Sequence, residues 1–575
     1  MKQRFALLLG LLFFVAGFIL LPRAQAQTSA SATVIGTITD QSGAAIPSAT
    51  ITLTNVATNI STTAKSNGSG QYTFPTVTPG TYRVNISKQG FKDATVQNLV
   101  VDISKSYLVN VTMQVGEVSQ SVTVEAGVGA SLETTSAQVG NVIGSSEMST
   151  LPTLSHDAQE LINLQPSVSP GTGNFPTPMA RVSGAIDDQN TITLDGIDIT
   201  DDLVGGGTWI PTSIDSVQEF DMGVTNPNAT FGRSSGGNIS ILGKHGTNQY
   251  HGSVYWYTQN SALNANSWDF NAAGVKQPHV DDNRGGVDFG GPIIKNKTFF
   301  FAYYELRRFP QSDEFTKAIP TANLRAGLLT FKDAAGNINT YNLANSTACG
   351  PAGGQICDPR QLGISPAVQA FWNLLPPNGN FTCQTCDGLN ETGFRGAAPA
   401  PLQTDNGIFR LDHNFNDRWH FSGQYDYFRS IQTGNGAQFD LLNPANPIAL
   451  GGNFLRAVLA SGQLTTQISP NLTNTFRFGW VRNWQNAPVI TPAQSAAEFA
   501  GLSSGAVTGT ASGVASDPFI GINPAEALVS SVIENTATNA RFQDYFEKSI
   551  QFNDAVDWIK GKHTLEFGTD DVCPC

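Results

Sequence analysis

The feature that most constrains this chain is a change of pattern on either side of a glycine-rich stretch, residues 231–250. Before it lies a compact polar segment that contains residues 190–198. After it, aromatic-rich segments alternate apolar and polar residues, beginning at 251–258. Alternation with a period of two produces strands with two unlike faces. The pattern therefore predicts a small globular unit that is joined through glycines to a sheet of amphipathic strands.

Residues 1–26 are predicted to be an export signal. Lys2 and Arg4 give a positive start, an apolar run covers 5–21, and Ala24 and Ala26 form a small-residue cleavage site. No later apolar run reaches the roughly 20 residues of a membrane helix. A barrel strand needs only about 9–11 residues, of which every second one faces lipid. The amphipathic strands are thus compatible with a membrane barrel.

The charge balance excludes one class of partner. The chain of 575 residues has 32 Lys and Arg against 45 Asp and Glu, which gives a net charge of -13. A nucleic-acid partner needs a basic face, so we expect no nucleic acid. The length is sufficient for several domains.

Residues 31–126 are predicted to form a β-sandwich, because short alternating runs recur about every 8–12 residues between turn signals. The segment also contains a set of turn and core residues: Gly36, Asp40, Gly43, Ile46, Pro47, Ala49, Asn67, Gly70, Tyr72, Phe74, Pro79, Gly80, Tyr82, Gly90 and Phe91. In these residues it resembles the carboxypeptidase regulatory-like domain. The resemblance implies a transthyretin-like or carbohydrate-binding-like sandwich without catalytic residues, and a sugar-binding role by analogy only.

Several motifs follow one another within residues 131–245. They are the 149–152 segment, a short helix over 157–166, a strand pair at 181–184 and 191–198 with its Asp-Gly turn, the 214–220 segment and the glycine-rich exit at 231–240. In this order they resemble the plug domain of TonB-dependent receptors. The resemblance implies an α+β plug.

Residues 250–575 are predicted to be part of a transmembrane antiparallel β-barrel. Short polar turns at 294–297, 414–417, 469–472 and 559–562 join strands in pairs, and long stretches such as 310–400 and 485–545 separate the pairs. Short turns at one rim and long loops at the other are typical of outer-membrane barrels. The nine expected strands are 253–258, 287–289, 298–306, 408–415, 418–428, 460–468, 474–484, 549–558 and 563–567.

The order of sandwich, plug and barrel resembles the Oar-like branch of TonB-dependent receptors. The resemblance implies an outer-membrane receptor for energised uptake, with its sandwich in the periplasm. It also implies an inner-membrane TonB-type complex, outer-membrane lipid and an unidentified extracellular ligand as partners, with an oligosaccharide as one candidate. A plugged transporter barrel has about 22 strands, so we expect this chain to be truncated. The alternative is a secreted or surface β-modular adhesin, or a carbohydrate-binding protein, without a pore.

The segment Ser121, Val122, Thr123, Val124 and Glu125 looks like the short box by which TonB-dependent receptors are gripped through β-strand addition. The alternative is that the segment is the last strand of the sandwich or its linker. The sequence leaves both interpretations open.

Cysteines and histidines give no metal site. Because an exported chain meets an oxidising compartment, we expect Cys349, Cys357, Cys383 and Cys386 to form disulfides. Cys383 and Cys386 have the spacing of half a zinc site, but no histidine or second C-x-x-C accompanies them. We therefore expect no metal and no cofactor.

Enzymatic motifs are also weak. Residues 232–236 match G-x-S-x-G, but the buried strand and following helix of a nucleophile elbow are missing. We interpret these small residues as letting the plug backbone pass close to the barrel wall. His156 and Glu160 are expected to face solvent on a short helix, and the acid pairs at 187–188, 201–202 and 281–282 to lie in solvated loops. We expect no catalytic residue and no enzyme.

Overall fold

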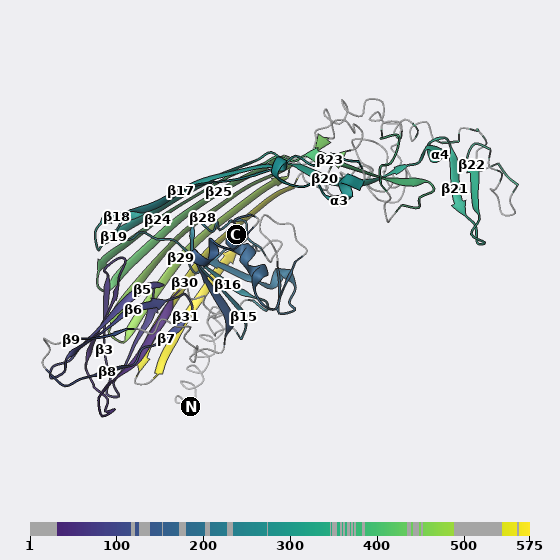
Figure 1. Ribbon diagram of the computed structural model, residues 1–575. Helices are drawn as coiled ribbons and strands as arrows, with labels where there is room; N and C mark the ends of the chain where they lie inside the picture. The colour runs from purple at the N-terminus through teal and green to yellow at the C-terminus, as the bar shows by residue number, and fades with distance from the viewer. Residues whose placement is uncertain are drawn as a thin grey trace, which may run out of the picture.

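The computed structural model places three parts of the chain side by side (Figure 1). A β-sandwich lies at one end of a large curved sheet, and a smaller mixed unit lies against one face of that sheet. The predicted signal peptide, 1–26, is outside the described residues. These are 31–116, 121–125, 138–171, 180–201, 207–226, 234–433, 439–440, 448–449, 452–487, 543–560 and 563–574, with gaps at 152, 154 and 273 and within 346–385.

The N-terminal part is a sandwich of two sheets, as predicted. One sheet has the order β3-β2-β5-β6-β9, and in the other β1 pairs with β4, β7 and β8. Alternate residues of β1, such as Val34 and Ile38, are fully buried between the sheets. The strands are β1 (Ala32–Asp40), β2 (Thr50–Asn55), β3 (Ser61–Lys65), β4 (Gln71–Val77), β5 (Gly80–Ser87), β6 (Asp93–Val101), β7 (Ser106–Leu108), β8 (Val111–Met113) and β9 (Ser121–Glu125).

Two strands of the sandwich, β3 and β6, lack the regular alternation from which a strand is predicted. The sequence of β3, STTAK, is almost wholly polar and has one buried residue. In β6 the alternation is broken because Asn98 has a φ of 57°, which leaves Gln97 and Asn98 both exposed. A bulge of this kind interrupts a period of two without ending the strand.

The mixed unit, which we call the plug, is built on a five-stranded sheet of order β10-β15-β16-β13-β14. The predicted Asp195-Gly196 turn joins β13 to β14, and both of its residues have positive φ, at 51° and 81°. The predicted short helix is a 3-10 helix, η1, capped by Asp157. The elements are β10 (Val139–Gly144), α2 (Ser145–Met148), η1 (Ala158–Leu164), β11 (Val168–Pro170), β12 (Ala180–Val182), η2 (Asp187–Gln189), β13 (Thr191–Leu194), β14 (Ile197–Asp198), β15 (Val217–Thr225) and β16 (Asn238–Gly243).

The large sheet, which we call the wall, has nine antiparallel strands in the order β17-β18-β19-β24-β25-β28-β29-β30-β31. In the part of the chain that the structure describes, the wall is open, because β17 and β31 each have a single neighbour in it. Its strands are β17 (His251–Asn260), β18 (Asp281–Ile294), β19 (Thr298–Phe309), β24 (Leu402–Asn416), β25 (Trp419–Thr433), β28 (Gly452–Ser469), β29 (Leu472–Ala487), β30 (Gln543–Lys560) and β31 (His563–Pro574).

These nine strands are the nine that the sequence predicts, and they occur in the same order. The strands are longer than predicted, and the short turns at 294–297, 414–417 and 469–472 join them as expected. Lys560 pairs with His563 at the fourth predicted turn. These three turns and the Lys560–His563 pair lie at one rim of the wall, which we call the short-turn rim, and the sandwich lies at that rim (Figure 1).

The two faces of the wall differ in the way that lipid requires. Toward the plug, β29 presents Arg477 and Asn483, which are 4% and 3% exposed. On the opposite face, Phe409, Phe478 and Phe552 are exposed. An apolar outer face and a polar inner face are the arrangement of a membrane barrel, and they invert the arrangement of a soluble sheet.

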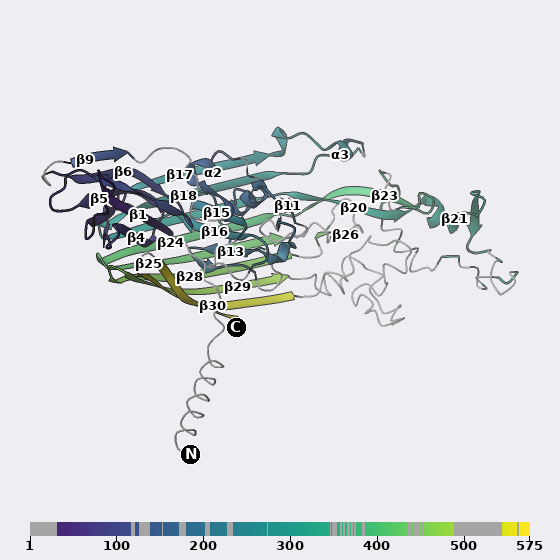
Figure 2. The same ribbon diagram turned by 90° about the horizontal axis from the view of Figure 1, so that it is seen from below.

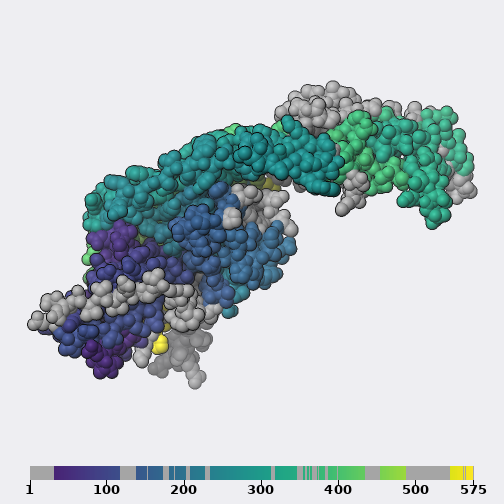
Figure 3. Space-filling model, viewed as in Figure 1, coloured from purple at the N-terminus to yellow at the C-terminus, as the bar shows by residue number. Residues whose placement is uncertain are grey.

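An arm extends from the other rim of the wall (Figure 3). The sequence pattern had indicated only a long loop between 310 and 400. The arm instead contains antiparallel pairs of β20 (Ser312–Pro320) with β23 (Glu391–Pro399) and of β21 (Leu328–Lys332) with β22 (Ile338–Asn342). The remaining elements are η3 (Ser261–Leu263), α3 (Trp268–Ala272), α4 (Ala322–Arg325), β26 (Phe439–Asp440) and β27 (Ile448–Ala449). None of the described helices is long and apolar enough to cross a membrane.

Candidate functional site

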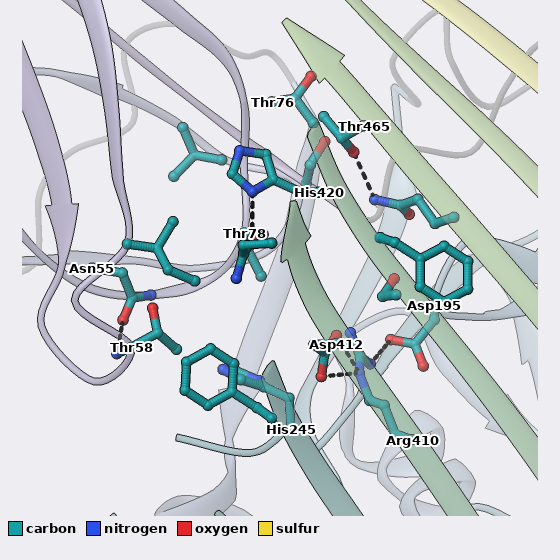
Figure 4. Close-up of a pocket in the computed structure, with 18 of the residues that line it drawn as sticks. Asn55, Thr58, Thr76, Thr78, Asp195, His245, Arg410, Asp412, His420 and Thr465 are labelled. Atoms are coloured by element: carbon teal, nitrogen blue, oxygen red, sulfur yellow. Dashed lines mark hydrogen bonds and ion pairs between the residues drawn. The ribbon is translucent and has the colours of Figure 1, made fainter. Parts of the chain in front are cut away.

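The plug is fixed to the wall by a buried ionic cluster (Figure 4). Arg410 of β24 points between two carboxylates. Its Nη1 lies 3.1 Å from Oδ1 of Asp195, in the turn of the plug, and its Nε lies 3.2 Å from Oδ1 of Asp412, on the same strand. The three side chains are 9%, 14% and 19% exposed, in the order Arg410, Asp195 and Asp412. One cation thus joins a turn of the plug to the wall.

Burial dominates the electrostatics of this cluster. It raises the pKa of Asp195 although Arg410 acts to lower it, and the Oδ2 atom of Asp195 has no hydrogen-bond partner among the described residues. Burial also lowers the pKa of nearby His245 to about 4, so that its imidazole is neutral at pH 7. The removal of charged groups from water has this effect on acids and bases alike.

A cavity of about 200 Å³ lies beside the cluster. All three parts of the chain line it: Asn55 and Thr78 come from the sandwich, Asp195 from the plug, and His420 and Thr465 from the wall (Figure 4). Apolar side chains, among them Ile197 and Leu242, line it together with these polar ones. The junction of sandwich, plug and wall thus encloses a cavity of mixed lining that is large enough to hold water beside the ionic cluster.

The same plug turn meets the wall at a second place. Ile197 packs against Gly479 of β29, where an added Cβ would approach Cγ2 of Ile197 to 2.6 Å. Next to it, Gln551 of β30 accepts a hydrogen bond from the backbone N–H of Asp198 at 3.0 Å and donates one to its carbonyl oxygen at 2.6 Å. The Asp-Gly turn region is therefore held by an ion pair, by close packing and by backbone hydrogen bonds.

A further contact joins the start of the plug helix to the wall. The ring of His156 stacks on that of Tyr257 with 4.1 Å between centroids. Glu160 accepts hydrogen bonds from the backbone of Ser155. The expectation that His156 faces solvent on the helix was wrong, because His156 precedes the helix, with a φ of 55°, and is turned toward β17. Glu160 lies on the helix, as expected, and is half-buried.

The sandwich docks on both the plug and the short-turn rim. The N–H of Ile103 donates to Oε2 of Glu219 in β15 at 2.8 Å. Asn248, in the joint between plug and wall, donates from Nδ2 to the carbonyl oxygen of Thr58 at 2.6 Å. Burial raises the pKa of Glu219 to about 7. The plug is thus enclosed by the wall on one side and contacted by the sandwich at one end.

The predicted contact segment, Ser121–Glu125, is strand β9. It pairs in parallel with β6, from Asp93 opposite Ser121 to Gln97 opposite Glu125. This placement agrees with the interpretation of the segment as the last strand of the sandwich. It does not test whether a partner also binds the segment, so that role stays a prediction.

The other predicted features fall in several places. Cys386 is disulfide-bonded, whereas Cys349, Cys357 and Cys383 lie outside the described residues, so the pairing of the four stays a prediction. Cys573 is exposed in β31. Among the described residues, no group of three His, Cys, Asp or Glu side chains could hold a metal ion.

The expectation that the acid pairs lie in solvated loops was wrong for two of them. The pair at 281–282 lies in strand β18, where Asp282 forms an ion pair of 2.6 Å with Arg307. Asp201 is buried rather than solvated.

The expectation that the small residues of the exit let the backbone pass close to the wall was also wrong. The exit packs tightly against the plug itself, since a Cβ on Gly236 would lie 2.9 Å from the carbonyl oxygen of Gln189. The backbone passes close to the wall later, at Gly246, where a Cβ would lie 2.4 Å from a carbonyl oxygen of β19.

Sequence reasoning missed the residues that join plug and wall. Arg410 lies within an expected strand, but nothing local marks it as a partner of Asp195, which is 215 positions away. A weak signal was present, because a charged residue in the middle of an amphipathic barrel strand must face inward.

Comparisons with known proteins agree with this architecture. Residues 242–571, more than half of the chain, match the family model described as outer membrane beta barrel domain, and residues 33–114 match the carboxypeptidase regulatory-like domain. The TonB-dependent transporter Oar of Myxococcus xanthus is 26% identical over 281 residues, which cover 47% of this chain and 26% of that protein. The chain therefore spans about a quarter of the length of this curated relative.

Solved structures of outer-membrane proteins are also similar. The outer membrane transporter YddB from Escherichia coli has a TM-score of 0.44 at 12% identity, over 75% of this chain and 48% of that one. The siderophore receptor PirA from Acinetobacter baumannii has a TM-score of 0.40 at 12% identity, over 75% and 46%.

Proposed function

The chain belongs to the outer membrane beta barrel domain family, and on this premise we propose that it is part of a TonB-dependent transporter of the cell outer membrane. One observation carries the proposal: a compact plug packs against the polar face of a wall whose other face is apolar. Side chains of the wall, among them Phe428, Leu455 and Val481, belong to the same apolar core as the plug. A barrel wall with a folded unit on its inner face serves as a gated passage rather than as an adhesive surface.

The contacts between plug and wall suit a plug that must move. A buried ion pair contributes little net stability over its separated, hydrated charges. Water that enters from the adjacent cavity can solvate Arg410 and Asp195 as they separate. A seam closed only by apolar packing would have no partly separated state that water stabilises. The cluster therefore holds the plug at rest and can release it when force is applied.

The proposed orientation follows from the rims. Outer-membrane barrels have short turns on the periplasmic side and long loops outside. The sandwich lies at the short-turn rim and the arm at the other (Figures 1 and 3). We place the sandwich in the periplasm and the arm at the cell surface, where an extracellular ligand arrives.

The partners in this proposal come from the resemblance. An inner-membrane TonB-type complex grips Ser121–Glu125 by strand addition, the outer face of the wall contacts lipid, and the extracellular ligand is unidentified, with an oligosaccharide as the candidate. A sugar ligand is supported only by the resemblance of the sandwich to carbohydrate-binding-like folds. Uptake of labelled oligosaccharides by cells with and without the gene tests it. The proposal assigns no catalytic activity.

Photo-crosslinking in cells tests the transport role. A photoreactive amino acid at Thr123 should yield a covalent adduct with the TonB-type protein, and the product should be found in the outer-membrane fraction. The same amino acid at Thr63, an exposed residue of β3, is the matched control and should yield none. A protein that fractionates with soluble periplasmic or secreted material, without the adduct, would support the adhesin instead.

A further inference from the structure

Four basic side chains form a row across the outer face of the wall. They come from β25, β28, β29 and β30, which lie side by side (Figure 2). Arg456 follows Leu455 and Arg482 follows Val481, and both of these apolar residues belong to the core that is shared with the plug. Because successive side chains of a strand point to opposite faces, the two arginines point away from the plug. The other two cations also stand next to buried residues of the inner face, and we call Arg429, Arg456, Arg482 and Lys548 the basic row.

The basic row lies just beyond the apolar band of the wall. Lys560 ends β30 at the short-turn rim, and Lys548 lies twelve positions before it. Twelve residues of a strand span about 40 Å, which is about 30 Å across a bilayer at the tilt of a barrel strand. The hydrocarbon core of a bilayer is also about 30 Å thick. The row is therefore level with the head groups of the leaflet on the side of the arm.

Aromatic side chains mark the same level. The Cζ atom of Arg456 lies 5.4 Å from the centre of the Trp484 ring, and that of Arg482 lies 5.0 Å from the centre of the Phe546 ring. Aromatic residues collect at the edges of the apolar band, and the face of a ring attracts a cation. The rings thus hold two guanidinium groups at the interface without neutralising them.

Like charges stand directly opposite each other in the basic row. Arg429 is the register partner of Arg456, and Arg482 is the register partner of Lys548. Directly opposed side chains have Cβ atoms about 5 Å apart, and like charges in this position destabilise a sheet. Arg456 and Arg482 are diagonal neighbours, about 7–8 Å apart. Four positive charges therefore share one small area, and an anion between them would remove their repulsion.

The part of the chain that the structure describes does not supply this anion. None of the four cations forms an ion pair with a described carboxylate. Asp405 lies opposite Arg429 on the same face. Its Oδ1 atom already accepts from Arg308 at 2.8 Å and from the hydroxyl of Tyr304 at 3.0 Å. Asp544 lies beyond the row, at the second residue of β30.

We propose that the basic row binds the phosphate of a lipid head group in the leaflet on the side of the arm. Arginine matches two phosphate oxygens with parallel hydrogen bonds, and lysine adds a compact charge. The acyl chains of the same lipid lie on the adjoining apolar face, where Phe478 and Phe552 are exposed. A soluble phosphate has no such second contact. This inference rests on the proposed function, which places the outer face in lipid, and it adds the chemistry of one lipid that the wall selects.

The lipid selectivity of the whole chain tests the proposal. Protein is extracted from the outer-membrane fraction into a neutral detergent and titrated with phosphatidic acid, whose head group is a phosphate alone, or with phosphatidylcholine. The fraction that retains each lipid is measured by native mass spectrometry. Arg456→Gln with Arg482→Gln removes the two central charges, whereas Arg456→Lys with Arg482→Lys keeps them. The matched control is Lys560→Gln, because Lys560 lies 4.9 Å from the ring centre of Trp558 at the other rim.

The wild type, the lysine pair and the Lys560→Gln control should all prefer phosphatidic acid. The glutamine pair should bind it on the order of tenfold or more weakly, because each basic side chain near a membrane surface contributes separately to the attraction of an anionic lipid. Equal affinity of the glutamine pair and the wild type would overturn the proposal. Full displacement of the lipid by inorganic phosphate would also overturn it, and would mean that the row is a site for a free anion.

The same preparation separates this inference from the proposed function. Because the substitutions lie on the outer face, all of these proteins should be recovered from the outer-membrane fraction. A wild type that is found in the soluble fraction would contradict the proposed function. A wild type that is embedded in the membrane but binds the two lipids equally would contradict this inference alone.

Discussion

Replacement of Arg410 by methionine removes the one cation that the ionic cluster shares between plug and wall. Methionine keeps much of the volume, so the change is mainly one of charge. Two carboxylates, Asp195 and Asp412, then remain in a site where their side chains are 14% and 19% exposed. Removal of one partner from a buried ion pair typically costs about 3–5 kcal/mol.

Protonation sets an upper limit on this loss. An aspartate with an ordinary pKa of about 3.9 can be neutralised at pH 7 for about 4 kcal/mol. We therefore expect the plug turn to open about 3–4 kcal/mol more easily, which is on the order of 100-fold or more in an opening equilibrium. Hydrogen exchange of the 191–198 amides measures this, most directly at Asp198, whose N–H donates to Oε1 of Gln551 in the wall at 3.0 Å.

The loss should depend on pH with a defined sign. Burial already raises the pKa of Asp195, and Arg410 opposes that rise. Without Arg410 the pKa in the folded protein rises further, so stability is lost as pH rises above the unfolded value near 4. The deficit should shrink by up to about 1.4 kcal/mol per unit as pH is lowered from 7 toward 4.

A double-mutant cycle tests whether the Arg410–Asp195 ion pair holds the plug. Asp195→Asn keeps an amide oxygen for the N–H of Gly243 and removes one of the two stranded charges. The Arg410→Met, Asp195→Asn protein should recover at least about 1.5 kcal/mol of the loss. Exchange within threefold of wild type for Arg410→Met, or strict additivity in the cycle, would refute the view that this ion pair holds the plug.

Three further predictions concern the seam, the docked sandwich and the outer face. Gly479→Ala should destabilise the plug–wall seam by about 1–3 kcal/mol through overpacking, and Ile197→Val should restore part of it in the double variant, both measured by exchange at 191–198. Burial raises the pKa of Glu219 to about 7, so the protection of the 102–105 amides against hydrogen exchange should fall as pH rises from about 4.5 to 7. Glu219→Gln should abolish this pH dependence. A pH dependence that persists in the variant would contradict the assignment to Glu219. Phe409→Arg, at the centre of β24, should cost about 2–4 kcal/mol in lipid and reduce the amount in the outer-membrane fraction, whereas Phe409→Leu should not.

Local patterns were sufficient for the strands of the wall, because each strand has a polar and an apolar face and each short turn carries its own signal. The positive φ values of Asp195 and Gly196 follow from the same local chemistry. The arm could not be predicted in this way. Its hairpins, such as Leu328–Lys332 with Ile338–Asn342, are mostly solvated on both faces and lack clear alternation.

The contacts between parts could not be predicted at all. Arg410 with Asp195, Gln551 with Asp198 and Ile103 with Glu219 join residues that are more than a hundred positions apart. The local sequence around each partner is that of an ordinary strand or turn residue. Their pairing depends on how sandwich, plug and wall fit together in three dimensions, which a single sequence does not encode locally.

Epitope insertion at the two rims tests the central claim most directly. A tag is placed after Ala335, in the exposed turn between β21 and β22, or after Lys295, in the turn between β18 and β19, within the gene in the cells that make the protein. A membrane wall with the proposed orientation predicts that antibody labels the first tag on intact cells and the second only after the outer membrane is permeabilised. Labelling of both tags on intact cells, or of the second alone, would contradict the account.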